Sequence, residues 1–119
     1  MSKILIVEDD KHQRILYKRE LEDEGYEVEL ASDGEEAVRK IEKEHFDLVI
    51  LDIRMPKMDG MEALAKILDK RRDILSIIHT AYSSYKNSFM SWAADAYIVK
   101  SSDLEELKCA VKELLGKKE

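Results

Sequence analysis

Carboxylate side chains stand where two apolar segments of this sequence end. Glu8 and Asp9 follow the apolar run at residues 3–7, and Asp52 follows the run at residues 48–51. Short apolar runs bounded by turn residues are typical of buried strands in a parallel sheet, and reactive groups gather just beyond the carboxyl ends of such strands. We therefore predict that Asp52 is the centre of a functional site.

A cluster of Glu8, Asp9 and Asp52 is expected if the two strands are neighbours, and it would need a counter-charge. Carboxylates about 5 Å apart repel by roughly 3 kcal/mol per pair at an effective dielectric near 20. Three pairs would cost about 10 kcal/mol, comparable to the whole stability of a small domain. A proton or a cation must relieve this repulsion. Because the ligands are all oxygen atoms, they favour a hard ion such as Mg²⁺, or Mn²⁺ in its place.

Two further polar residues follow strands predicted later in the chain. Thr80 follows the strand at residues 74–79, and Lys100 follows the strand at residues 96–99. A lysine would neutralise charge on a transferring phosphoryl group, and a hydroxyl would donate a hydrogen bond to it. With these companions, Asp52 is a candidate nucleophile that forms an acyl phosphate.

The rest of the chain predicts the elements that position these residues. Alternating strands and helices imply right-handed crossovers and a parallel sheet covered on both faces, which is a doubly wound α/β fold. Spacing alone does not fix the strand order. No linker, repeat or low-complexity segment interrupts residues 1–119, so we expect one domain. Strands are expected at residues 3–7, 26–30, 48–51, 74–79 and 96–99, with helices after Asp10, Asp33, Asp59 and Ser102 and around residues 86–93.

The first helix allows the most detailed local prediction. Asp10 and Gln13 have the spacing of a capping box, and Gly25 has the position of a helix-terminating glycine. An apolar stripe should face the sheet and hold the helix against it. This stripe is expected to comprise Ile15, Leu16 and Leu21.

Composition excludes several classes of function. The 119 residues carry a formal net charge of −6 with no cluster of Lys or Arg, which argues against direct nucleic-acid binding. No apolar run is long enough to span a membrane or to form a signal peptide. The lone Cys109 excludes a disulfide framework and fits a reducing compartment, so a cytoplasmic location is expected. His12, His45 and His79 share no metal-binding spacing and are interpreted as surface or rim residues.

Taken together, the motifs strongly resemble the receiver domain of bacterial two-component response regulators, including chemotaxis-type and phosphorelay-type members. Each motif alone is commonplace, but together they occur in the order and spacing of that family over essentially the full length. The matching segments are residues 4–10 (ILIVEDD), 52–60 (DIRMPKMDG), 80–81 (TA) and 97–100 (YIVK).

The resemblance implies a flavodoxin-like sheet with strand order 2-1-3-4-5 and a metal-assisted phosphoacceptor site. It makes Asp52 the phosphoacceptor and places Mg²⁺ on the carboxylates of Asp9 and Asp52 and the backbone carbonyl of Arg54. Glu8 would act mainly through metal-bound water, and Lys100 would contact the phosphoryl group. Such a domain is not a conventional enzyme, but it catalyses its own phosphorylation and its own slow dephosphorylation.

The resemblance also implies a two-state switch. Thr80 would move towards the phosphoryl group, and Tyr97 would pack inward behind it. This would remodel the face formed by the helix near residues 86–93, the strand at 96–99 and the last helix. The implied phosphodonor is a sensor histidine kinase or a phosphotransfer protein. Downstream, the face would bind an effector or an output domain, with the protein a monomer or a phosphorylation-dependent dimer.

Two features depart from, or vary within, the family pattern. Ser101 follows Lys100 where the family usually has a proline in a cis peptide bond. Because a non-proline cis bond costs about 2.5–4 kcal/mol, we expect either a trans bond with a shifted loop or a strained cis bond. Arg54 and Tyr82 occupy positions that modulate dephosphorylation in the family. Both are bulky here, which predicts a long-lived phosphoryl group.

Two alternative functions stay open at this point. An aspartyl-phosphate phosphohydrolase would usually carry its nucleophile after the first strand, with a second Asp two residues on, whereas Arg54 stands two residues after Asp52. A receiver-like interaction domain with impaired phosphorylation is the other alternative. Ser101 keeps it open, whereas the intact acids, Thr80 and Lys100 argue against it. Three aromatic residues at helical spacing could be either core or a partner-binding face; they are Tyr85, Phe89 and Trp92.

Overall fold

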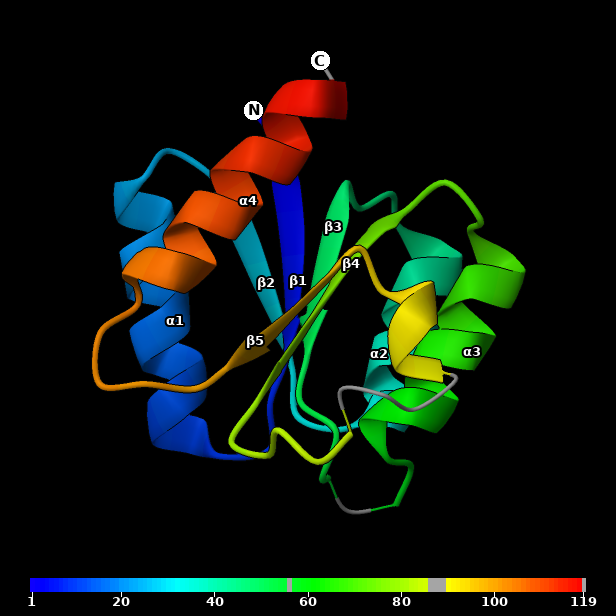
Figure 1. Cartoon of the computed structure of the whole chain (residues 1–119). Coiled ribbons are helices and arrows are strands. Elements are labelled where there is room, and N and C mark those ends of the chain that lie inside the picture. The colour runs from blue at the N-terminus through cyan, green and yellow to red at the C-terminus, as the bar shows by residue number, and fades with distance from the viewer. Residues whose placement is uncertain (56, 86–89, 119) are drawn as a thin grey trace.

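The computed structural model describes residues 1–55, 57–85 and 90–118. Within them, five parallel strands form one sheet with the order β2-β1-β3-β4-β5, as the resemblance implied (Figure 1). The described elements are β1 (Lys3–Val7), α1 (Lys11–Asp23), β2 (Glu27–Ala31), α2 (Gly34–Lys43), β3 (Leu48–Leu51), α3 (Gly60–Lys70), β4 (Leu75–Thr80), the 3-10 helix η1 (Met90–Ala93), β5 (Ala96–Val99) and α4 (Glu105–Lys118).

The sheet is buried on both faces because its strands alternate between two apolar clusters. In β1, Ile4 and Ile6 belong to the cluster beneath α1 and α4, whereas Leu5 and Val7 belong to the cluster beneath α2 and α3. Figure 1 shows these two pairs of helices on opposite faces of the sheet. This explains why the strands read as nearly unbroken apolar runs in the sequence.

Three predicted N-caps are present, but the capping box of α1 is only half formed, because the backbone N–H of Asp10 donates to Glu8 at 3.2 Å and not to Gln13. Backbone N–H groups of Gln13, Glu36 and Glu62 donate to the side chains of Asp10, Asp33 and Asp59 at 2.9–3.0 Å. Gly25 follows α1 with φ of +98°, a left-handed conformation that glycine adopts without the steric penalty of a Cβ atom. The start of α4 differs from the prediction, because Asp103 rather than Ser102 accepts a hydrogen bond from the backbone of Glu105.

The predicted apolar stripe of α1 was right at Leu21 and wrong at Ile15 and Leu16. Ile15 and Leu16 are 44% and 47% exposed, whereas Tyr17 and Leu21 are buried against the sheet. Positions 17 and 21 are four apart and share one helix face, while position 15 lies about 200° around the helix from position 17. A large aromatic residue therefore occupies the inner face in place of two aliphatic ones.

The helix predicted around residues 86–93 lies partly outside the described residues. Its described part, Met90–Ala93, is the short 3-10 helix η1. Across the parts of the chain that the structure describes, no helix is long and apolar enough to cross a membrane.

Candidate functional site

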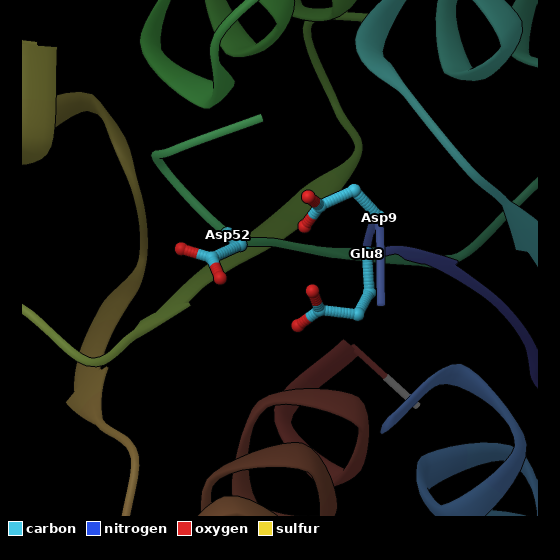
Figure 2. Close-up of side chains that lie close together, drawn as sticks. All are labelled: Glu8, Asp9 and Asp52. Atoms are coloured by element: carbon cyan, nitrogen blue, oxygen red, sulfur yellow. The ribbon is translucent and has the colours of Figure 1, made fainter. Parts of the chain in front are cut away.

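Three carboxylates meet at the carboxyl ends of two neighbouring strands. β1 pairs with β3, with Val7 opposite Leu51, so Glu8 and Asp9 emerge beside Asp52. One carboxylate oxygen from each of the three residues lies within 4.8 Å of those of the other two. Figure 2 shows the three groups gathered around a common space. The predicted convergence of these acids is therefore present in the structure.

The three acids differ in burial, and this difference favours a bound cation. Glu8 and Asp52 are only 3% and 8% exposed, whereas Asp9 is open to solvent. Burial raises the pKa of Glu8 above its ordinary value even though Lys100 acts to lower it. Among the described residues, the buried Oδ1 of Asp52 has no hydrogen-bond partner. An unsatisfied anionic oxygen within an all-oxygen ligand set fits a hard divalent cation such as Mg²⁺.

Lys100 supplies the positive charge next to these acids. Its Nζ donates to Oε1 of Glu8 at 2.6 Å and to Oδ2 of Asp52 at 2.7 Å, and its side chain is 16% exposed. Burial acts to lower the pKa of Lys100, but the hydrogen bonds and charges of Asp52 and Glu8 outweigh burial and raise it. Lys100 therefore stays protonated at neutral pH and supplies a positive charge to both buried carboxyl groups.

Two residues of α1 take part in the site in ways that sequence reasoning missed. Gln13, assigned only to helix capping, accepts a third hydrogen bond from Nζ of Lys100 at 2.6 Å. Arg14 donates from Nη1 to the backbone carbonyls of Glu8 and Asp9 at 2.8 and 2.9 Å, which fixes the chain after β1. The sequence signal for both was only their place in the first turns of the helix that follows the acids.

Thr80 ends β4, and Tyr97 lies on the neighbouring strand β5. Thr80 is fully buried, and its Oγ1 accepts a hydrogen bond from the backbone of Tyr82 at 3.4 Å. Tyr97 is half-buried against the core beneath α3, and its hydroxyl donates to the carbonyl of Tyr82. Both predicted switch residues therefore contact the same segment after β4.

An arginine and two tyrosines form a cluster at the exposed rim. The guanidinium carbon of Arg54 lies 4.6 Å from the ring centroid of Tyr82, and its Nε and Nη2 donate to the hydroxyl of Tyr85 at 3.3 Å. The two tyrosine rings meet edge to face at 6.3 Å. Both predicted dephosphorylation-tuning residues thus belong to one contact group, which we call the Arg54 cluster (Arg54, Tyr82 and Tyr85).

Gly60 allows the loop after β3 to fold back onto Asp52. A Cβ atom at Gly60 would lie 1.9 Å from the backbone oxygen of Asp52, and the Gly60 N–H donates to the carbonyl of Ile53 at 2.7 Å. Only glycine permits so close an approach. In the same loop, Lys57 has φ of 68°, which is uncommon for a residue with a side chain.

Comparison with known proteins identifies the family. A family model described as the response regulator receiver domain matches residues 4–112. The chain belongs to this family. The Response regulator ArlR of Staphylococcus saprophyticus is 34% identical over 116 residues, which are 97% of this chain and 53% of that protein. This receiver domain therefore spans about half the length of the curated relatives that it matches.

Solved structures of receiver domains share the fold closely. Response regulator protein TrrA of Thermotoga maritima, crystallised in complex with Mg²⁺-BeF, is 48% identical with a TM-score of 0.93, over 96% of this chain and 99% of that one. A crystal structure of histidine kinase ThkA in complex with TrrA matches at 49% identity and a TM-score of 0.91, over 97% of this chain and 99% of that one.

In the receiver domain Lys100 contacts Asp52 although Ser101 follows it. The described residues contain no cis peptide bond, so the Lys100–Ser101 bond is trans, and the strained cis alternative does not occur. The backbone N–H of Lys100 donates to the carbonyl of Thr80 at 2.7 Å, which extends the pairing of β5 with β4. Lys100 therefore reaches Asp52 although the usual proline is missing.

The structure corrects the interpretation of His79 and narrows the open alternatives for Trp92 in this receiver domain. His79, interpreted as a rim residue, is 3% exposed and packs edge-on against Tyr17 at 5.1 Å. Burial, with the charge of Lys100, lowers the pKa of His79 to about 4, so it is neutral at physiological pH. Trp92 is 72% exposed, which excludes it from the core, and Phe89 lies outside the described residues.

Proposed function

We propose that this receiver domain is a phosphoacceptor switch in a two-component or phosphorelay system. Asp52 would accept a phosphoryl group from the phosphohistidine of a sensor histidine kinase or a phosphotransfer protein. The observation that carries the proposal is the convergence of Lys100 and two further carboxylates on Asp52. A solvated strand-end acid without a function would need neither the buried lysine nor the other acids.

The proposed reaction moves one phosphoryl group between two nucleophiles. An ionised oxygen of Asp52 attacks phosphorus, an O–P bond forms, and the P–N bond to the donor imidazole breaks. The electron pair of that bond returns to the imidazole nitrogen, which takes up a proton. Lys100 stays protonated and donates to a phosphoryl oxygen, so its ammonium must give up one of its present carboxylate partners. Such positioned charge is the main source of catalysis in phosphoryl transfer.

A divalent cation completes the proposed site. Asp9, Asp52 and the backbone carbonyl of Arg54 would hold Mg²⁺ directly, and Glu8 would act through a metal-bound water. The cation would supply positive charge that offsets the carboxylates and the incoming phosphate. Support comes from the unpartnered Oδ1 of Asp52 in the described structure and from the Mg²⁺-BeF complex of TrrA. Mn²⁺ has the same ligand preference and is proposed as a substitute.

The proposed output is a change in the face that η1, β5 and α4 present. Thr80 would move to the phosphoryl group, and Tyr97 would give up its bond to Tyr82 and pack inward. Because curated relatives are about twice as long, the downstream partner is proposed to be either an output domain or a separate effector. Phosphorylation-dependent dimerisation and a cytoplasmic location, where a histidine kinase would meet its partner, belong to the same proposal.

Incubation with acetyl phosphate or phosphoramidate and Mg²⁺, followed by intact-mass measurement, tests this function. We expect one phosphoryl adduct on the wild type, none on Asp52→Ala and an unchanged adduct on Asp69→Ala, which removes an exposed acid of α3. No adduct on the wild type would favour the interaction-domain alternative and contradict the proposal. Sustained release of phosphate over many turnovers would favour the phosphohydrolase alternative.

A further inference from the structure

The ammonium of Lys100 is fully coordinated, and its third acceptor is not an acid. A lysine ammonium has three N–H donors. Two of them reach Glu8 and Asp52, and the third reaches the amide oxygen of Gln13 at 2.6 Å. Gln13 comes from α1, whereas the two acids come from the ends of β1 and β3. The lysine is therefore held between the sheet edge and the neighbouring helix.

The side chain of Gln13 is itself held in one orientation by Tyr17, which lies one turn later in α1. The hydroxyl of Tyr17 donates to the same Oε1 of Gln13 at 2.9 Å, and Tyr17 is 5% exposed. The ring of Tyr17 packs against the buried His79, so the hydroxyl cannot swing freely into solvent. Because an ammonium can only donate, the amide of Gln13 must present its oxygen to Lys100, and the Tyr17 hydroxyl donates to that same oxygen and helps to hold it there.

A neutral acceptor has a role that the two acids cannot fill. During phosphotransfer Lys100 must exchange a carboxylate oxygen for a phosphoryl oxygen, and the acids will also be drawn to a bound cation. The amide of Gln13 carries no charge, so its hydrogen bond to Lys100 survives both events. It can keep the ammonium at the reacting edge of Asp52 while the other two partners change.

We infer that Gln13 is a positioning residue for Lys100: its amide oxygen, oriented by Tyr17, holds the ammonium beside Asp52 while the phosphoryl group arrives. This inference rests on the proposed function and deepens it. It also gives a physical reason why Lys100 reaches Asp52 with Ser101 in place of the proline, because a contact from α1 restrains the side chain directly.

The test compares Gln13→Met, which keeps length but removes the acceptor, with Tyr17→Phe, which keeps the packed ring and removes only the hydroxyl. We expect phosphorylation by acetyl phosphate with Mg²⁺ to slow about tenfold for Gln13→Met, the loss of one charge-assisted hydrogen bond, and about threefold for Tyr17→Phe. Arg19→Met, which alters an exposed side chain of the same helix, should match the wild type.

A double-mutant cycle separates positioning from a general structural effect. Affinity for Mg²⁺ with beryllium fluoride, measured by calorimetry, should fall for Gln13→Met in the wild-type background and should not fall further in the Lys100→Ala background. An equal loss in both backgrounds, or full activity of both Gln13→Met and Tyr17→Phe, would overturn the inference. If the wild type takes no phosphoryl group, the proposed function itself fails, which is a different result.

Discussion

Two cationic side chains belong to the Asp52 region, and their surroundings are opposite. Lys100 is mostly buried and donates to two carboxylates and one amide at 2.6–2.7 Å. Arg54, two residues after Asp52, is exposed and contacts only tyrosines among the partners that the structure describes, at 3.3 Å or more. Lys100 is fixed against Asp52, whereas Arg54 lies over an aromatic ring at the rim.

The difference teaches which step each cation can influence. A buried ammonium with short bonds to Asp52 would act where charge develops on the phosphoryl group, after it exchanges one carboxylate partner for a phosphoryl oxygen. An exposed guanidinium stacked on a ring contributes little electrostatic energy in water, but its bulk can exclude solvent. We therefore assign Lys100 to the formation of the acyl phosphate and the Arg54 cluster to its lifetime.

Replacing each cation with alanine gives the largest expected effect. Lys100→Ala should slow phosphorylation by acetyl phosphate about 100-fold or more, the scale on which one preorganised donor contributes. Arg54→Ala should leave that rate within about threefold, because an exposed cation is screened by solvent. Rates from intact mass against time provide the measurement. Comparable losses in the two variants would remove the distinction between the cations.

The Arg54 cluster should control how long the phosphoryl group persists. The double variant Arg54→Asn, Tyr82→Glu replaces two bulky side chains with smaller ones that can accept hydrogen bonds. Water then gains access to the phosphoryl group, and the introduced carboxylate can orient it. We expect dephosphorylation to accelerate about tenfold, less than the factor of about 10²–10⁴ that a fully positioned general base supplies. Decay of the phosphoryl adduct after removal of the donor measures this. Decay no faster than in the wild type would refute the predicted shielding.

Substitution of Glu8 measures how much stability the protein loses by burying acids around Lys100. Because burial raises the pKa of Glu8, its ionisation costs stability as the pH rises through that pKa in the folded protein. Without Mg²⁺ at neutral pH, Glu8→Gln should raise the free energy of unfolding by on the order of 1 kcal/mol, because it removes a buried charge while Lys100 keeps its ion pair with Asp52.

The gain from Glu8→Gln should shrink as the pH falls towards 4.5, the ordinary pKa of a glutamic acid, since Glu8 is then protonated in the wild type as well. Urea unfolding at several pH values measures this, with the exposed Glu22→Gln as control. A constant gain across the pH range would show that the charge of Glu8 is not its cause. Added Mg²⁺ should stabilise the wild type more than the variant.

Much of this site could be predicted from the sequence because strand ends are local signals. Three charged residues directly follow apolar runs: Glu8, Asp52 and Lys100. Each comes two residues after an isoleucine of the cluster beneath α1 and α4. Since side chains alternate along a strand, the sequence could even have placed these three on the α1 side of the sheet.

What could not be predicted depends on how helices lie against the sheet. The hydrogen bond that Lys100 donates to Gln13 joins positions 87 residues apart, and it exists only because α1 lies beside the end of β5. Burial of Tyr17 in place of Ile15 follows from the same docking, since either residue is compatible with an amphipathic helix. Trp92 lies in η1 and is 72% exposed, and helical spacing alone does not indicate which aromatic residues of that region face solvent.

Substitution of Tyr85 should have the smallest effect, and it tests only the role of the Arg54 cluster. Tyr85→Phe keeps the ring that meets Tyr82 and removes the hydroxyl that accepts two N–H groups of Arg54. Because these bonds are long and exposed, we expect dephosphorylation to accelerate only about twofold, with phosphorylation unchanged. In the Arg54→Asn, Tyr82→Glu background the substitution should have no effect, since the guanidinium that it anchors is gone. An equal acceleration in both backgrounds would mean that Tyr85 excludes water directly. Its hydrogen bonds to Arg54 would then have no part in the lifetime of the phosphoryl group.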